Sequence, residues 1–397
     1  METLFLNHNR LVNAVSTRFY RYLYPKINWE NRLVGITGAR GTGKTTLLLQ
    51  HIKNNFPAGN QALYVSLDNI WFQRRTLTDL VQEFHAYGGT HIFVDEVHRY
   101  ADWALEIKNL YDSYPDLHIV FTGSSMLKIH RAKADLSRRL RLYELHGLSF
   151  REFLLFNSDV NINAVSLDDI IRRHREISVD ISAKIKVLPL FRQYLKLGYY
   201  PFFQEDTEGY DERLQRVINV ILENDLPAVE AVEYGTIIKI KKLLIMMASL
   251  VPFVPNITEL SAKLETSRTM LLKYLNYLEN AGLILSLMTA NKGMGVMNKP
   301  DKIYLNNTNL LYALGAGNVN EGNERETFFA NQMGIGHTLE IPKKGDFLVN
   351  ADYTFEIGGA NKTNRQIQNV PNAYIAMDNI ETGFNNKIPL WMFGMMY

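Results

Sequence analysis

A glycine-rich segment contains the residue types that bind nucleotide phosphates. Residues 38–45 read GARGTGKT and fit the pattern G-x-x-x-x-G-K-[ST]. The apolar run Leu33–Ile36 before it predicts a strand, and residues 45–53 after it predict a helix. Glycines let the backbone curl, so that successive N–H groups and the helix N-terminus point at phosphate oxygens. The pattern therefore predicts a phosphate-binding loop, and a chance glycine turn before a helix is the alternative.

The side chains of this loop divide the task of holding a triphosphate and its metal ion. Lys44 is expected to reach the β- and γ-phosphates, and the Thr45 hydroxyl to bind magnesium. The predicted cofactors are therefore ATP and Mg²⁺. The residues expected to contact the nucleotide are Gly38, Arg40, Gly41, Thr42, Gly43, Lys44, Thr45 and Thr46.

Two acidic residues directly follow another predicted strand. The run His91–Val94 is apolar, and Asp95 and Glu96 come next. Ligands of open α/β sheets bind where parallel strands end. Asp95 is expected to hold Mg²⁺, and Glu96 to act as the general base on the water that attacks the γ-phosphate. An acidic pair after a strand is more often a solvated turn, but the upstream loop favours the catalytic interpretation.

Two further positions are candidates for catalysis. Ser124 follows the predicted strand 117–122, and its hydroxyl would help to orient water; a turn of small residues is the alternative. Residues 128–141 carry six basic side chains and one acidic one. This segment is either a solvated basic helix or the source of an arginine finger for a neighbouring subunit's nucleotide. Arg139 is the preferred finger, ahead of Arg138.

The elements that must position these residues follow from the alternation of apolar runs and helical stretches. Helical stretches include 44–54 and 103–111, and residues 8–24 also show helical spacing up to Pro25. Runs of strand length lie at 33–36, 62–67, 91–94, 117–122 and 140–145. This alternation predicts an α/β fold with a mostly parallel sheet that is covered on both faces.

Beyond residue 150 the pattern becomes mainly helical. Helices are expected at 168–174, 185–197, 211–226 and 237–250. A short helix, a turn near Thr266 and a second helix ended by Gly282 then predict a helix-turn-helix. The remainder contains strand-like runs at 302–305, 346–349 and 353–357.

Composition excludes some classes of protein. The 397 residues include no cysteine, so disulfides and thiolate metal sites are impossible. The formal net charge of +2 neither requires nor excludes nucleic acid. The start of the chain lacks a signal-peptide pattern, and the apolar stretch 243–254 is too short to span a bilayer. We therefore expect a soluble, cytoplasmic protein with no membrane partner.

Taken together, these segments resemble the AAA+ ATPases. Within them the chain is similar to a prokaryotic group that joins an ATPase core to a winged helix and a C-terminal domain of the PD-(D/E)xK nuclease type. The resemblance rests on GARGTGKTTLL (38–48), IFVDEVHRY (92–100), FTGSS (121–125), LSRRLRLYELHGLSFREFL (136–154), FRQYLKLGYYP (191–201) and ETFFANQ (326–332). It implies that Ser124 is the sensor residue and Arg139 the finger, although the family usually has glycine where Arg138 stands.

The resemblance also implies a domain organisation. It comprises an N-terminal helix (1–25), an ATPase core (26–155), a helical connector (156–235), a winged helix (236–300) and a small α/β nuclease-like domain (301–397). In the winged helix, Arg268, Lys273 and Tyr274 lie on the helix that such folds place in the DNA major groove. A protein-docking or lid-like domain is the alternative.

The nuclease-like domain has acids but lacks one expected lysine. Glu326, Asp346 and Glu356 correspond to the acids that hold a divalent metal in active members of this fold. The lysine expected two residues after Glu356 is Gly358, and nothing in the sequence shows that Lys362 replaces it. We therefore expect an inactive or structural copy.

The predicted function is ATP binding and slow hydrolysis coupled to a conformational change. Homo-oligomerisation is consistent with it, because a finger arginine acts on a neighbour's nucleotide. A nucleotide-gated DNA-binding or regulatory module and an ATP-dependent nuclease are the alternatives, so the partner is either DNA or protein.

Overall fold

A computed structural model describes most of the chain. The described residues are 1–56, 59–123, 136, 138–228, 230, 232–250, 254–289, 299–315 and 319–397. They form two compact units, of which the first contains residues 1–146 and 220–232, and the second residues 147–219 and 233–397. A short segment from the second half of the chain therefore completes the first unit. The domain boundaries expected from the sequence are finer than this division and stay predictions.

The first unit is built on a parallel sheet of five strands. Its strands are β1 (Leu33–Thr37), β2 (Ala62–Ser66), β3 (His91–Asp95), β4 (His118–Gly123) and β5 (Arg141–Glu144). They lie in the order β2-β3-β4-β1-β5, and every neighbouring pair is parallel. The predicted α/β fold with a parallel sheet is confirmed, and each strand agrees with its predicted run to within one residue at either end. The loop after β1 and the acids after β3 consequently lie at the same edge of the sheet.

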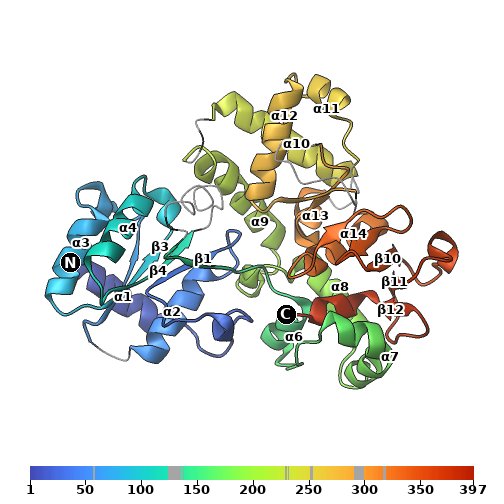
Figure 1. Ribbon diagram of the computed structural model, residues 1–397, viewed down its shortest axis with the longest axis horizontal. Coiled ribbons are helices and arrows are strands. Elements are labelled where there is room, and N and C mark those ends of the chain that lie inside the picture. Colours follow the sequence, from blue (N-terminus) through green and yellow to red (C-terminus); the bar gives the residue numbers. More distant parts are fainter. Residues whose placement is uncertain are drawn as a thin grey trace. The chain divides into compact units, whose positions relative to one another are not determined.

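Helices cover both faces of this sheet. On one face, α2 (Lys44–Asn55) packs against β1 residues that include Val34. On the other face, α3 (Leu77–Ala86) and α4 (Trp103–Ser113) pack against residues that include Leu33 (Figure 1). Because side chains alternate along a strand, successive residues of β1 enter opposite cores. The sheet is therefore held rigidly from both sides, which fixes the edge where the loop begins.

The N-terminal helix differs from its prediction. α1 spans Glu2–Ala14, so the expectation of a helix over 8–24 is wrong in its second half. The Gln50 side chain on α2 donates hydrogen bonds to the carbonyls of Ser16 and Phe19, both at 2.8 Å. The carbonyls of Ser16 and Phe19 are thus hydrogen-bonded to a side chain from another part of the fold. This stretch can therefore satisfy these backbone groups without forming a helix.

A buried histidine lies in the core on the α2 face. The His51 ring stacks on Trp29 with 3.7 Å between ring centroids. Its Nδ1 lies 3.2 Å from the amide nitrogen of Asn55, and because an amide nitrogen only donates, the ring nitrogen accepts. Burial, together with a smaller effect of His91, lowers the pKa of His51 to about 4. The folded protein therefore holds this ring in its neutral form.

We expect His51 to make the first unit less stable in acid. The unfolded chain, where the histidine pKa is near 6.5, takes up a proton that the folded ring does not. The free energy of unfolding is thus highest above that pH and falls as the pH drops toward 4, by about 2 to 3 kcal/mol for this group. Urea unfolding at about pH 7 and pH 5 measures the loss, which should be smaller in His51→Phe. Equal losses in the two proteins contradict this assignment.

The second unit contains a mixed sheet. Its strands are β8 (Leu339–Glu340), β9 (Phe347–Val349), β10 (Tyr353–Gly358), β11 (Ala373–Met377) and β12 (Lys387–Pro389). They lie in the order β12-β11-β10-β9-β8. The β8–β9 and β9–β10 pairs are antiparallel, whereas β10–β11 and β11–β12 are parallel. Helix α14 (Glu321–Met333) packs on this sheet, with Phe329 against Phe355 of β10.

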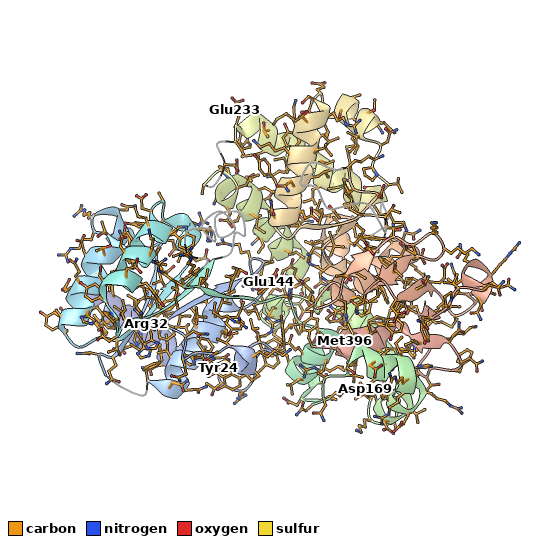
Figure 2. The ribbon with its side chains drawn as sticks, in the orientation of Figure 1. Tyr24, Arg32, Glu144, Asp169, Glu233 and Met396 are labelled. Atoms are coloured by element: carbon orange, nitrogen blue, oxygen red, sulfur yellow. The ribbon has the colours of Figure 1, made fainter. Side chains whose placement is uncertain are left out.

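The remaining helices of the second unit confirm the helical pattern expected beyond residue 150. They are α6 (Phe150–Ser158), α7 (Leu167–Ser182), α8 (Val187–Leu197), α9 (Tyr210–Val220), α10 (Tyr234–Leu250) and α13 (Thr308–Leu314). Asp169, labelled in Figure 2, lies in the first turn of α7, and its backbone N–H donates to the Ser166 hydroxyl at 3.1 Å. That hydroxyl caps the helix and explains where it begins. Within the described ranges, no helix has both the length and the apolar character that crossing a bilayer requires.

The predicted helix-turn-helix is also present as a pair of helices. The elements here are α11 (Ile257–Lys263), α12 (Arg268–Asn280) and the antiparallel strands β6 (Ile284–Leu287) and β7 (Lys302–Leu305). Arg268 and Lys273 of α12 are exposed. Tyr274 is only 3% exposed, because it shares the buried face of α12 with Leu271 and Leu278. The expectation that Tyr274 lies at a DNA-facing surface is therefore wrong.

Candidate functional site

The glycine-rich loop runs from the end of β1 into α2, as the sequence predicts. Gly38 and Gly43 have φ angles of 151° and 95°, which residues with a side chain rarely adopt. A Cβ atom at Gly38 would lie 2.2 Å from the backbone oxygen of Leu145. The path of the loop beside β5 therefore requires glycine at this position.

The Lys44 ammonium lies inside the curl of the loop. Its Nζ donates to the backbone oxygens of Gly38 and Ala39, each at 2.9 Å, and the residue is 5% exposed. Burial lowers the pKa of Lys44, while the charges of Glu96 and Asp95 act in the opposite direction. A sequestered ammonium at the start of a helix is well placed to bind phosphate oxygens.

Other predicted loop residues have different partners. Thr42 is buried, and its hydroxyl donates to the backbone oxygen of Ala39 at 2.9 Å, which closes the loop. The Arg40 guanidinium donates to the carboxylate of Asp225 at 3.2 Å. Thr46 lies in the first turn of α2 and is exposed. The loop is thus braced by its own hydroxyl and by one carboxylate from another segment.

Asp95 is the centre of a hydrogen-bond network at the edge of the sheet. Its Oδ2 accepts hydrogen bonds from the Thr45 hydroxyl at 2.6 Å and the Tyr64 hydroxyl at 2.9 Å. Its Oδ1 accepts from the Thr122 hydroxyl and from the backbone N–H of Glu96 at 3.1 Å. Burial and the neighbouring Asp95 charge raise the pKa of Tyr64, so that hydroxyl remains a donor. Side chains from the two neighbouring strands, β2 and β4, and from the loop helix therefore hold this carboxylate.

The oxygen donors at this position fit magnesium. Mg²⁺ prefers oxygen ligands and commonly takes one or two protein groups together with phosphate oxygens and water. Thr45 and Asp95, the two predicted ligands, are in direct contact. In the part of the chain that the structure describes, no cluster of three or more His, Cys, Asp or Glu side chains can hold a metal ion by itself. This arrangement suits a metal ion that arrives with a nucleotide.

Glu96 follows Asp95 in an unusual backbone conformation. Its φ is 54°, in the left-handed region that few residues other than glycine adopt. Conformations of this kind cost energy and cluster at functional sites. Its Oε2 lies 3.3 Å from His98 Nε2 and 3.8 Å from Arg40 Nη1. The carboxylate is therefore located where the sequence places a general base, although that role stays a prediction.

Of the two remaining predicted catalytic residues, the structure describes only one. Ser124 lies outside the described residues. Arg139 precedes β5, whose first residue Arg141 pairs with Val34 near the start of β1, so it lies at the sheet edge opposite the loop. Its guanidinium forms two hydrogen bonds with the Asp112 carboxylate, at 2.9 and 3.0 Å. Within one copy of the chain, Arg139 therefore lies away from the phosphate loop.

Sequence reasoning missed several residues of this site. They are Arg21, Tyr64, His98, Thr122 and Asp225. The buried Arg21 donates to the backbone oxygens of Thr42 and His146 and so braces the loop from the N-terminal segment. Thr122 is a polar residue at a strand end, a signal that could have identified it. Tyr64 looks like a core residue of an apolar run, and Asp225 like one acid of a helix, so neither carried a signal.

The acids predicted in the second unit lie close enough to influence one another. Burial raises the pKa of Glu326 and of Glu356, and the charge of Asp346 raises both further. Each acid also has a partner within the protein. The Tyr304 hydroxyl donates to Glu326 at 2.7 Å, and the backbone N–H of Ile357 donates to Asp346 at 2.8 Å. Glu326 lies on α14, Asp346 just before β9 and Glu356 in β10, but among the described residues no three such side chains are arranged to hold a metal ion.

A lysine lies beside this cluster. Lys362 Nζ is 2.5 Å from Glu356 Oε1. A Cβ atom at Gly358 would lie 2.5 Å from Lys362 Cγ, so the lysine side chain fills the space next to that glycine. The resemblance to the nuclease-type domain led us to expect a lysine at position 358. The side chain of Lys362 lies next to that position.

Comparison with known proteins assigns the first unit to a class. Residues 30–154 match the family model described as an AAA domain. With the five-stranded parallel sheet and the phosphate loop, this match defines an AAA-type P-loop ATPase domain. Residues 188–321 match a domain of unknown function, DUF8612. The winged-helix and nuclease-like assignments therefore stay predictions.

Similarity extends over most of the chain. An uncharacterized protein of Methanocaldococcus jannaschii is 26% identical over 371 residues, which cover 86% of this chain and 78% of that protein. The Walker-type ATPase of Pyrococcus abyssi is 11% identical with a TM-score of 0.41, covering 78% of this chain and 95% of that one. AMPPCP-bound DnaA from Aquifex aeolicus is 12% identical with a TM-score of 0.28, covering 70% and 88%. Structural likeness at this level supports no inference about function.

Proposed function

We propose that the first unit binds ATP with magnesium and hydrolyses it slowly, and that hydrolysis drives a conformational change of the chain. One observation carries this proposal. The 2.6 Å hydrogen bond between Thr45 and Asp95 joins the phosphate loop to the acidic pair, next to the buried ammonium of Lys44. A loop that binds phosphate and a carboxylate that binds metal are thus parts of one site.

Each residue of this site has a distinct task in the proposed reaction. The loop N–H groups and Lys44 bind the phosphates, and Thr45 and Asp95 hold the magnesium ion. The metal supplies positive charge that stabilises the transferring phosphoryl group. Glu96 orients the attacking water and accepts its proton. Tyr64 and Thr122 keep the Asp95 carboxylate in place through their hydrogen bonds.

Phosphate release from ATP tests the proposal directly. The purified chain should release phosphate from ATP only when magnesium is present, because neither Thr45 nor Asp95 supplies the positive charge that the metal would bring to the transferring phosphoryl group. Thr45→Ala should raise the magnesium concentration needed for half-maximal turnover. A wild-type protein that neither binds ATP nor releases phosphate contradicts the proposed function.

We propose that Arg139 acts on the nucleotide of a second copy. Mixing Arg139→Ala with Glu96→Gln should restore turnover, because the second protein donates the arginine to the intact base of the first. Removing a finger arginine typically lowers kcat by about 10³-fold or more, so the gain on mixing is large. Phosphate release by each variant alone and by the mixture measures it. A mixture no more active than its components, or an unimpaired Arg139→Ala, contradicts the role.

DNA binding is a second candidate, and the exposed Arg268 and Lys273 on α12 favour it. A nucleotide-gated module should shift duplex DNA in a gel in a way that depends on ATP. Arg268→Ala combined with Lys273→Ala should weaken the shift and its dependence on salt. A shift that is unchanged by these substitutions places the DNA contact elsewhere.

A nuclease is the third candidate, and the position of Lys362 favours it. The alternative is that the nuclease-like domain (301–397) is inactive and has only a structural role. This alternative is supported by the hydrogen bonds that Glu326 and Asp346 accept from other groups of the protein. DNA cleavage with Mg²⁺ or Mn²⁺ that disappears in both Asp346→Ala and Lys362→Ala would establish the nuclease. We expect the structural copy, and thus no cleavage with either metal.

A further inference from the structure

A buried carboxylate from far along the chain contacts the phosphate loop. Asp225 ends η5 (Ile221–Asp225), a single π-helical turn in the segment 220–232 that completes the first unit. Its side chain is 2% exposed, and its Oδ2 accepts a hydrogen bond from Arg40 Nη1 at 3.2 Å. One ion pair therefore joins the phosphate loop to a segment whose two ends continue along the chain into residues of the second unit.

Asp225 also has two other basic partners. Arg99 Nη2 lies 2.9 Å from its Oδ1, and His98 Nε2 lies 3.5 Å from the same atom. Burial acts to raise the pKa of Asp225, but contact with His98 and the two arginine charges outweigh burial and lower it. The carboxylate is therefore ionised, and His98 and Arg99 would still neutralise it without Arg40. The contact with Arg40 is thus one that Asp225 can lose without becoming an unpaired buried charge.

Arg40 lies at the end of the site where the terminal phosphate of ATP is expected. Its Nη1 is 3.8 Å from Oε2 of Glu96, the residue proposed to act on the water that attacks that phosphate. Burial is the main cause of the lowered pKa of Lys44, and the charges of Arg40 and Asp225 also act on this group. The Arg40 side chain is 31% exposed whereas Asp225 is buried, so the guanidinium is the partner that can turn toward a ligand.

We propose that Arg40 distinguishes ATP from ADP: its guanidinium leaves Asp225 for the γ-phosphate of ATP and stays on Asp225 when ADP is bound. This inference rests on the proposed function and names the residue that recognises the terminal phosphate. A guanidinium forms charge-assisted hydrogen bonds with phosphate, and a terminal phosphate carries more negative charge than a carboxylate. ADP has no group at that position, so the ion pair with Asp225 persists.

This exchange of partners makes the segment 220–232 sensitive to the bound nucleotide. With ADP, Asp225 keeps all three basic partners. With ATP, the segment loses the ion pair that joins it to the phosphate loop and is then held by His98 and Arg99. The residues on either side of the segment belong to the second unit, so the covalent chain carries the change onward. The conformational change proposed for the ATPase would therefore begin at Asp225.

Binding titrations with magnesium test the inference, using ADP and AMPPCP, an ATP analogue that resists hydrolysis. They compare full-length wild type, Arg40→Gln and Asp225→Asn. Arg40→Gln should lower the affinity for AMPPCP by about 10-fold or more, because it removes a charged partner of the γ-phosphate. Asp225→Asn should raise that affinity by about 5-fold, because Arg40 no longer has to leave a carboxylate. The affinity for ADP should stay within about 2-fold of wild type in both variants.

Two further proteins show whether Asp225 acts through Arg40. In the Arg40→Gln background, Asp225→Asn should not change the affinity for AMPPCP, because the residue through which it acts is gone. Arg10→Gln neutralises an exposed arginine of α1 and is the control for a lost positive charge, so both affinities should match wild type.

Hydrogen exchange of residues 220–228 in the wild type is a second measurement that needs no variant. Exchange should be faster with AMPPCP than with ADP, because only the triphosphate draws Arg40 away from Asp225. Equal or slower exchange with AMPPCP overturns the inference, and this result decides the matter if Asp225→Asn does not fold.

The outcomes separate this inference from the proposed function. A wild-type protein that binds neither nucleotide removes both. A wild-type protein that binds both nucleotides, with equal losses for AMPPCP and ADP in folded Arg40→Gln, removes the inference alone. An effect of Asp225→Asn that persists in the Arg40→Gln background shows a merely structural role of Asp225 and also overturns it.

Discussion

Replacing Lys44 with alanine should abolish ATP binding. The ammonium lies inside the loop with Gly38 and Ala39 as its backbone partners, and no other lysine is part of the phosphate-loop motif. Loss of charge-assisted hydrogen bonds to the β- and γ-phosphates costs about 3 kcal/mol or more, which corresponds to an affinity about 100-fold lower. Titration with a fluorescent ATP analogue in the presence of magnesium measures this change.

The control for this substitution is Lys26→Ala, which removes an exposed lysine of the same unit. It should leave affinity unchanged. Because the substitution removes the donor to the backbone oxygens of Gly38 and Ala39, circular dichroism and thermal unfolding are used to check that Lys44→Ala is folded. Folded Lys44→Ala that binds the analogue as tightly as wild type contradicts the assignment of the loop.

The parts of the fold and site that the sequence predicted are those encoded by neighbouring residues. The phosphate loop is one contiguous pattern, and each strand of the first sheet is a short apolar run bounded by polar or turn residues. The position of Asp95 and Glu96 follows from the strand before them. Because parallel strands end at one edge, local patterns were enough to bring the loop and the acids together.

The parts that could not be predicted depend on contacts between distant residues. The Gln50 side chain donates hydrogen bonds to the carbonyls of Ser16 and Phe19, in place of the bonds of a helix. The pattern of apolar residues in that stretch does not show this. Lys362 reaches the space beside Gly358 through the fold of a turn, which spacing along the chain does not show. Tertiary context thus overrides local preference at both places.

Asp225 illustrates the same limit at the site itself. In the sequence, Asp225 is one acidic residue within a stretch predicted to be helical. Its basic partners come from distant parts of the chain and are visible only in the folded structure. His98 and Arg99 follow the acidic pair after one residue, so the sequence could show that they lie near Glu96. It could not show that the Asp225 carboxylate contacts them. A residue whose role is defined by a contact across more than a hundred positions has no signature in a single sequence.

Replacing Glu96 with glutamine should stop turnover and leave ATP bound. Glutamine has the same shape and the same freedom at the left-handed φ of 54°, so the turn into η3 (Val97–Arg99) is expected to persist. It cannot accept a proton from water, and the loss of a general base lowers kcat by about 10² to 10⁴-fold. Binding persists because Lys44, Thr45 and Asp95 are untouched. Single-turnover phosphate release and analogue titration separate the two effects.

The comparison with Glu144→Gln makes this result specific to the base. Glu144 ends β5 at the same edge of the sheet and is exposed, so the substitution makes the same change of charge without contact to Asp95. It should leave kcat unchanged. If Glu96→Gln turns over ATP at the wild-type rate, another group activates the water, and the 3.3 Å contact between Glu96 and His98 serves only to hold the turn. If it binds no ATP, Glu96 acts in the ground state, and the division between a binding loop and a catalytic carboxylate does not hold.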